Sequence, residues 1–87
     1  MTEYQHIQFS KRAVYKIVVQ GKLDESWSDR FGNMTIQWEE KGKHRYITNL
    51  SGLIEDQAAL SGILNGLYDL RFTVLSVECL GTEDEHS

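Results

Sequence analysis

Two short stretches carry the side chains best placed to bind a small ligand. Asp24 precedes Trp27 by three residues, which puts a carboxylate and an indole at the start of one expected helix. Gln57 follows Asp56 at the start of a second expected helix. The Asp24 carboxylate suits acid–base chemistry, and the Gln57 amide suits hydrogen bonding across a groove. Asp24, Trp27 and Gln57 are therefore candidate ligand-binding residues, although helix capping and solvated helix starts are the favoured explanation.

The histidines and the cysteine do not form a recognisable site. None of His6, His44 and His86 has a second metal-type side chain three or four residues further on, so we expect no metal ion. Cys79 is the single cysteine, and we expect it to point inward as a small hydrophobe without an adjacent cation to favour the thiolate. Phosphate-binding, dinucleotide-binding and serine-hydrolase motifs are missing from the sequence. We therefore expect no cofactor, no catalytic residue and a protein that is not an enzyme.

The charge of the chain argues against two classes of partner. Nine Lys and Arg against 13 Asp and Glu give a net charge of −4, and three of the acids stand together at 83–85. The remaining body, at −1, suits neither nucleic acid nor a membrane surface. No apolar run approaches the roughly 20 residues of a membrane span. The N-terminus shows no signal pattern, and one cysteine allows no internal disulfide, so we expect a cytoplasmic location.

The first half of the chain predicts strands around one short helix. Residues 13–20 are short, β-branched and ended by a glycine, as in a strand. Residues 24–31 predict about two helical turns, with Asp24 as the N-cap. Residues 34–38 alternate as a strand, a charged turn follows at 39–43, and 44–49 is the return strand. We expect Met34, Ile36 and Trp38 to point inward from the first strand of this hairpin and Tyr46 from the second.

The second half predicts a long helix and a last strand. Asp56 is the expected N-cap of a helix that ends near Leu70. Leu60, Ile63, Leu64 and Leu67 are spaced so that they share one face of that helix. Residues 72–80 predict the last strand, and the side chains expected to point inward are Leu75, Val77 and Cys79.

The order of these elements predicts an α+β fold. Strand, short helix, strand, strand, long helix, strand is the ferredoxin-like βαββαβ pattern. It implies a four-stranded antiparallel sheet in the order 4-1-3-2 with both helices on one face. A β-meander with one helix is the alternative if the short helix does not form. The domain spans 13–81, between an N-terminal arm (1–12) and a flexible acidic tail (82–87).

Several motifs resemble a family of small uncharacterised bacterial proteins. The motifs are Y-x-I-x-V-x-G-x-L-D-x-x-W-S from Tyr15 and D-Q-A-A-L-x-G-x-L from Asp56, followed by Asp69-Leu70 and Leu75-Ser-Val77. The resemblance covers about 14–80 and implies no known activity. The family has glycine after Asp-Leu, whereas this chain has Arg71, at the expected helix C′ where positive φ is common.

The face of the sheet turned away from the helices is the candidate interface. Three valines are expected there, and contiguous exposed apolar surface marks binding sites. The candidate interface residues are Val14, Lys16, Val18, Val74 and Ser76. We therefore expect a homodimer, formed through the open face or an edge strand, that binds a protein partner or a small effector. The alternative is a cofactor-independent enzyme of the dimeric α/β-barrel kind, which would need a pocket lined by convergent polar groups.

Overall fold

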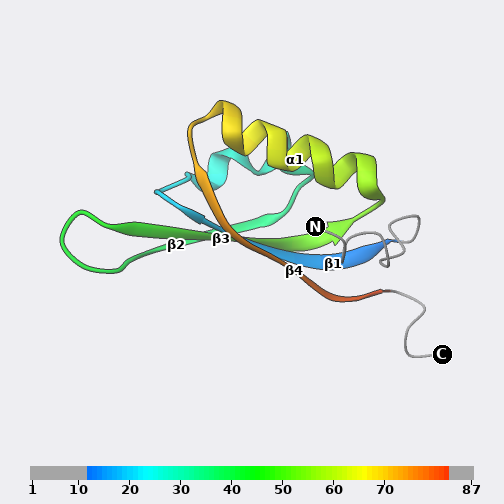
Figure 1. Ribbon diagram of the computed structural model, residues 1–87, viewed down its shortest axis with the longest axis horizontal. Helices are drawn as coiled ribbons and strands as arrows, with labels where there is room; N and C mark the ends of the chain where they lie inside the picture. Colours follow the sequence, from blue (N-terminus) through cyan, green and yellow to red (C-terminus); the bar gives the residue numbers. More distant parts are fainter. Residues whose placement is uncertain (1–11, 83–87) are drawn as a thin grey trace.

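The computed structural model describes residues 12–82, so the N-terminal arm before Arg12 and the acidic tail after Thr82 lie outside the described residues (Figure 1). The described chain contains four strands, one 3₁₀ helix and one α-helix. In chain order they are β1 (Ala13–Gln20), η2 (Glu25–Phe31), β2 (Thr35–Glu40), β3 (Tyr46–Ile54), α1 (Gln57–Asp69) and β4 (Thr73–Thr82).

The strands form one antiparallel sheet in the order β2-β3-β1-β4. Counted from the β4 edge, the same sheet reads 4-1-3-2. Figure 1 shows α1 and η2 on the same side of the sheet, and no described element covers the other side. The α+β class and the four-stranded antiparallel sheet expected from the sequence are confirmed.

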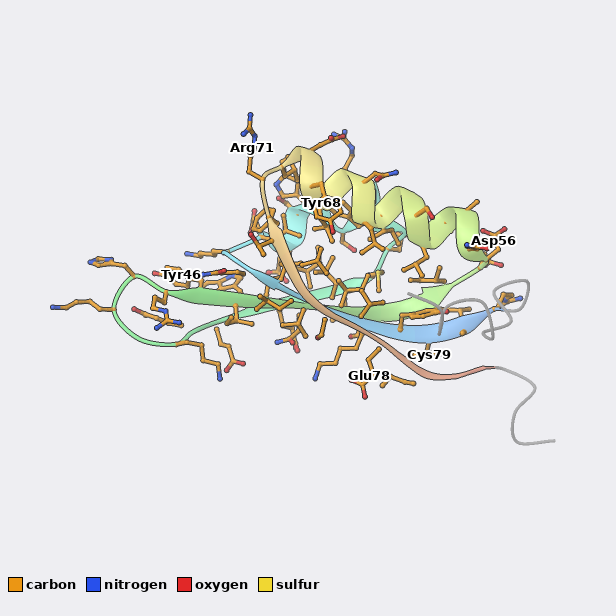
Figure 2. All side chains as sticks on the ribbon, in the orientation of Figure 1. Tyr46, Asp56, Tyr68, Arg71, Glu78 and Cys79 are labelled. Carbon is orange, nitrogen blue, oxygen red and sulfur yellow. The ribbon has the colours of Figure 1, made fainter. Side chains whose placement is uncertain are left out.

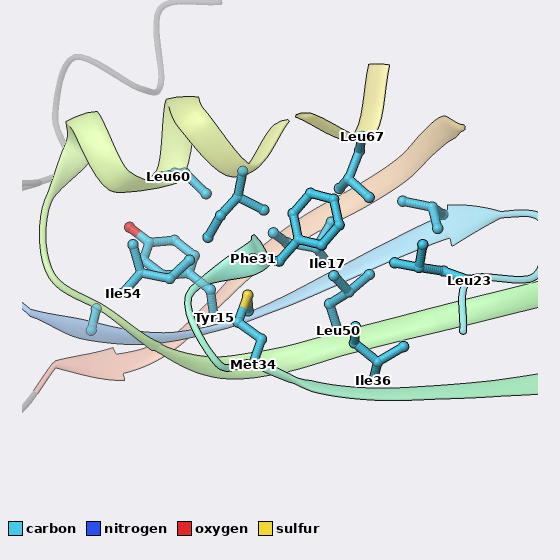
Figure 3. Packing of buried hydrophobic residues seen from close by; sticks show 13 residues of the cluster. Tyr15, Ile17, Leu23, Phe31, Met34, Ile36, Leu50, Ile54, Leu60 and Leu67 are labelled. Carbon is cyan, nitrogen blue, oxygen red and sulfur yellow. The ribbon is translucent and has the colours of Figure 1, made fainter. Parts of the chain in front are cut away.

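The core lies between the sheet and the two helices (Figure 3). Alternate residues of β1 are buried, and the pairing places Ile17 of β1 and Ile36 of β2 on either side of Leu50 of β3. Since opposite residues in a sheet share a face, all three point toward the helices. The helices cover them with Phe31 of η2 and with Leu60, Ile63 and Leu67 of α1. This side of the sheet is therefore a packed apolar interior.

Helix α1 begins and packs as the sequence predicts. The Asp56 carboxylate accepts a hydrogen bond from the Ala59 N–H at 2.9 Å, which is the interaction of an N-cap. Further along, Gly66 faces Phe31, and a Cβ atom there would lie 2.8 Å from the Phe31 ring. Glycine at this position therefore lets α1 lie directly on η2.

The short helix differs from the prediction in its cap. It is a 3₁₀ helix, and Asp24 stands at its N-cap position without capping it through the side chain. The Asp24 carboxylate instead accepts a hydrogen bond from Ser26 Oγ at 2.7 Å, while the Trp27 N–H donates to the Asp24 carbonyl at 3.1 Å. Because the backbone carbonyl already satisfies that N–H in a tight turn, the carboxylate is left for a neighbouring hydroxyl.

The facing of β4 corrects the sequence prediction. The pairing of β4 with β1 shifts register between Val18 and Val19 and again between Val14 and Tyr15. Each shift inserts an extra residue in β4 and breaks the two-residue alternation. As a result Val74, expected on the open face, packs against the core, whereas Leu75, expected inward, is 50% exposed. Cys79 stands opposite the core residue Tyr15, on the side expected, but it is exposed rather than buried because β4 is an edge strand.

The β2–β3 hairpin is longer than predicted. Strand β3 runs from Tyr46 to Ile54, rather than over 44–49. Figure 1 shows the hairpin loop extending beyond the end of α1. Trp38, expected in the core, is consequently 42% exposed, because it lies past the buried part of β2. Tyr46 is half-buried and shares the helix-facing side with the buried Thr48, as expected.

Candidate functional site

The open face of the sheet carries most of the residues predicted as an interface. Pairing places Val14 between Leu53 and Gly81, Lys16 between Ser51 and Glu78, and Val18 between Asn49 and Ser76. Figure 2 shows Glu78 on the side away from α1. Val14, Lys16, Val18 and Ser76 thus share one surface, and Val74 does not belong to it.

The apolar part of this surface lies at one end of the sheet. Val14 and its partner Leu53 are 38% and 36% exposed, and Leu80, the extra residue of the second β4 bulge beside Val14, is 53% exposed. We call these three residues the open-face patch. Lys16, Glu78 and Ser51 follow it with polar side chains, so the patch is bounded on one side by hydrophilic surface. An apolar patch with a polar border is typical of an interaction surface.

A hollow of about 450 Å³ lies on a different part of the sheet, beside β2. It is lined by Glu25 of η2, by Ile36, Gln37, Trp38 and Glu39 of β2, and by Asn49 of β3. Because Ile36 is nearly buried, it closes the hollow on its apolar side. The sequence prediction missed this site: its residues are distant in the chain, and only the position of β2 at the sheet edge brings them together.

The exposed ring of Trp38 is held by two neighbours. Lys22 Nζ lies 4.1 Å from the Trp38 ring centroid and 5.3 Å from that of Tyr46. The two rings meet edge to face with centroids 5.6 Å apart. These contacts fix the orientation of the indole at the rim of the hollow.

The predicted ligand-binding residues Asp24, Trp27 and Gln57 are not brought together. Trp27 lines a smaller hollow of about 130 Å³ between η2 and the Gly62–Gly66 side of α1, with Arg30 over its ring at 5.5 Å. Asp24 is exposed before η2, and Gln57 is exposed at the opposite end of α1. Nine residues of helix, about 13 Å, separate Gln57 from Gly66.

Tyr15 and Cys79 form a small polar pair at the β1–β4 pairing. They stand opposite each other in the register, and Tyr15 is 4% exposed. Burial, reinforced by the charge and hydrogen bond of the neighbouring Cys79, raises the pKa of Tyr15 to about 12. Tyr15 therefore stays protonated at neutral pH and is not a base.

Within residues 12–82, no group of three or more His, Cys, Asp or Glu side chains is arranged to hold a metal ion. The described part of the chain also contains no helix long and apolar enough to span a membrane.

Comparison with known proteins places the chain in an uncharacterised family. Residues 14–78 match the model of a domain of unknown function, DUF8691, and the chain belongs to that family. No curated protein and no solved structure matches it.

Proposed function

We propose that this protein is a non-enzymatic, ferredoxin-like interaction module that acts as a cytoplasmic homodimer. The observation that carries the proposal is the open-face patch, in which Val14 and Leu53 lie opposite each other on the uncovered side of the sheet and the exposed Leu80 stands next to them at the β4 bulge. The helices of a single chain cover only one face of the sheet. The same face of a second copy can cover the other one in a symmetric dimer. Bulges on β4 interrupt its edge, which favours the face over the edge as the contact.

The packed interior supports a binding role over an enzymatic one. A dimeric α/β-barrel enzyme needs a pocket with convergent polar groups between sheet and helices. In this chain the corresponding space is filled by apolar side chains, and the buried Thr48 has both its hydrogen bonds to backbone atoms. Both hollows described above lie outside this interior.

Light scattering tests the dimer directly. Each chain has a mass of 10.0 kDa, so we expect about 20 kDa at micromolar concentration. Val14→Glu should shift the mass to that of one chain, because a charge in the apolar centre of an interface is unfavourable. Tyr68→Glu is the control, since Tyr68 is also an exposed large hydrophobic side chain, at 59%, but lies on α1 (Figure 2). A wild-type mass of one chain at every concentration would refute the proposal.

A further inference from the structure

The hollow between η2 and α1 is kept open by a glycine that the packing of the chain does not require. Gly66 has a packing role, since a Cβ atom there would lie 2.8 Å from the Phe31 ring. A Cβ atom on Gly62, one turn earlier, would meet no atom of the described residues within 4 Å. Glycine inside a helix is less stable than alanine, and Gly62 lines the hollow of about 130 Å³. The chain therefore leaves open a space that an alanine side chain would fill with a gain in stability.

Two opposite charges stand at this hollow without meeting each other. Arg30 of η2 and Asp69 of α1 both line it, and both are exposed. Within residues 12–82 neither side chain forms an ion pair, whereas Arg12 pairs with Glu55 and Lys41 with Glu39. Asp69 is the last residue of α1, where the negative end of the helix dipole disfavours a carboxylate and favours a cation. Its position weakens the helix and strengthens the attraction of this side of the hollow for a positive group.

The positive charge lies on the other side of the hollow, beside an indole. The Arg30 guanidinium is 5.5 Å from the Trp27 ring centroid, a cation–π contact on the η2 side. Such a contact uses the flat face of the guanidinium and leaves the N–H donors at its edge available for a carboxylate. Trp27, Phe31 and Leu70 make up the apolar part of the lining. The hollow thus offers a cation, an anion and an apolar wall to one small molecule.

We propose that this hollow binds a free α-amino acid with a small side chain, such as alanine. The Arg30 guanidinium donates to the carboxylate of the ligand, and the Asp69 carboxylate accepts from its ammonium group. The side chain of the ligand lies over Gly62, against Trp27.

A small amino acid fits this lining in both charge and size. Its two charged groups give Arg30 and Asp69 a partner at the same time. A simple carboxylate leaves Asp69 unpaired and is repelled by it, and a simple amine is repelled by Arg30 in the same way. A cavity of roughly 150 Å³ holds benzene, and alanine has the same number of non-hydrogen atoms. The volume of about 130 Å³ therefore suits alanine at a site that is open to solvent.

NMR titration of the labelled full chain with L-alanine tests the site. We expect saturable shifts at the Gly62 and Gly66 amides and at the Trp27 indole N–H by about 50 mM, because a site with exposed charged groups binds in the millimolar range. Propionate lacks the ammonium group and ethylamine lacks the carboxylate, so each should bind at least about threefold more weakly. Equal binding of alanine and propionate would overturn the proposal, as would the absence of saturable shifts.

Gly62→Ala separates ligand binding from folding. The added methyl group should raise the urea midpoint of unfolding, because alanine favours the helix. It should also weaken the binding of L-alanine at least about fivefold, because it occupies the space of the ligand. A Gly62→Ala protein that binds L-alanine as tightly as the wild type would refute the site.

Two charge substitutions locate the ends of the ligand. Arg30→Gln and Asp69→Asn should each weaken the binding of L-alanine at least about threefold. Asp29→Asn is the matched control, because it removes the same charge from the residue next to Arg30, which does not line the hollow. Equal losses in Asp69→Asn and Asp29→Asn would overturn the proposal, since they would indicate a general effect of charge.

The hollow is separate from the proposed dimer contact. It lies between the two helices, whereas the open-face patch lies on the other side of the sheet (Figure 1). Val14→Glu should therefore bind L-alanine as tightly as the wild type. A chain that binds L-alanine but has the mass of one chain refutes only the dimer, and a dimer that does not bind L-alanine refutes only this site.

Discussion

Arg71 ends α1 in a backbone conformation that favours glycine. Its φ is +71°, its N–H donates to the Tyr68 carbonyl at 2.9 Å, and the Phe72 N–H donates to the Leu67 carbonyl at 3.0 Å. These two hydrogen bonds are those of a Schellman turn, in which the C′ residue is commonly glycine. Figure 2 shows the Arg71 side chain pointing away from the helix. The sequence resemblance, which has glycine at this position, thus anticipated the backbone although the residue differs.

We expect Arg71→Gly to leave the free energy of unfolding unchanged or to raise it by up to about 1 kcal/mol. A non-glycine residue in the left-handed region costs about 1 kcal/mol, whereas the cation near the helix C-terminus contributes about 0.3–1 kcal/mol. Arg71→Ala is the control, because it keeps the strain and removes the cation, and it should be less stable than the wild type. Urea melts measure both. A clear loss of stability in Arg71→Gly would show that the arginine side chain makes a stabilising contact.

Tyr15 makes stability depend on pH in the alkaline range. Its pKa is raised from 10.0 to about 12, first by burial and then by Cys79. Because the folded pKa lies above the unfolded one, the unfolded chain ionises first, and stability is lost as the pH rises from about 10 toward 12. Relative to Tyr15→Phe, which cannot ionise, the wild type should lose about 2 kcal/mol between pH 9 and pH 11.5. Parallel stability curves for the two proteins in urea melts would contradict this assignment.

Thr48 ties the β1–η2 connection to the centre of the sheet. Its fully buried hydroxyl accepts from the Leu23 N–H at 3.0 Å and donates to the Gly21 carbonyl at 2.6 Å. Gly21 has φ of +122°, and its N–H donates to the Tyr46 carbonyl at 2.8 Å. One hydroxyl therefore satisfies two backbone groups where the chain leaves β1. The sequence did not predict this role, because the pattern of residues 44–49 indicates only which side chains point inward and not which backbone groups they reach.

Replacing that hydroxyl with a methyl group should destabilise the fold. Thr48→Val keeps the shape and leaves the Leu23 N–H and Gly21 carbonyl without a partner, so we expect a loss of about 2–4 kcal/mol. Thr48→Ser retains the hydroxyl and should lose only about 1 kcal/mol for the missing methyl group. Chemical denaturation compares the two. Equal losses would mean that packing of the methyl group, rather than hydrogen bonding, is the main contribution of Thr48.

At the scale of elements, the sequence predicted the features that depend on neighbouring residues better than those that depend on how the strands pair. The residue pattern of 13–20 predicted the limits of β1, and Asp56 predicted the start of α1. Both features depend only on residues that are close together in the chain. The facing of Val74 and Leu75 could not be predicted in this way, because the bulges arise only when β4 pairs with β1. The exposure of Trp38 could not be predicted either, because it depends on where the helices stop covering the sheet. The hollow beside Trp38 depends in the same way on how η2 lies next to β2.

At the scale of the whole molecule, the proposed dimer contact and the hollow beside β2 occupy different parts of one sheet. The open-face patch lies where β1, β3 and the end of β4 meet, whereas the hollow lies beside β2 at the far edge. Two copies joined through the patch would leave both β2 edges free.

Self-association also predicts how thermal stability should vary with protein concentration. If two folded chains associate and unfolded chains do not, a hundredfold rise in concentration stabilises each chain by about 1.4 kcal/mol. For a domain of this size that corresponds to a rise in Tm of about 5–10 °C, which calorimetry or circular dichroism between 1 and 100 µM would measure.

Val14 is 38% exposed in the single chain, so Val14→Glu should melt at the Tm of the dilute wild type at every concentration. Tyr68→Glu should keep the concentration dependence of the wild type. A wild-type Tm that does not move over this range would contradict the dimer, and a Val14→Glu variant that melts far below the dilute wild type would show that Val14 supports the fold of the single chain instead.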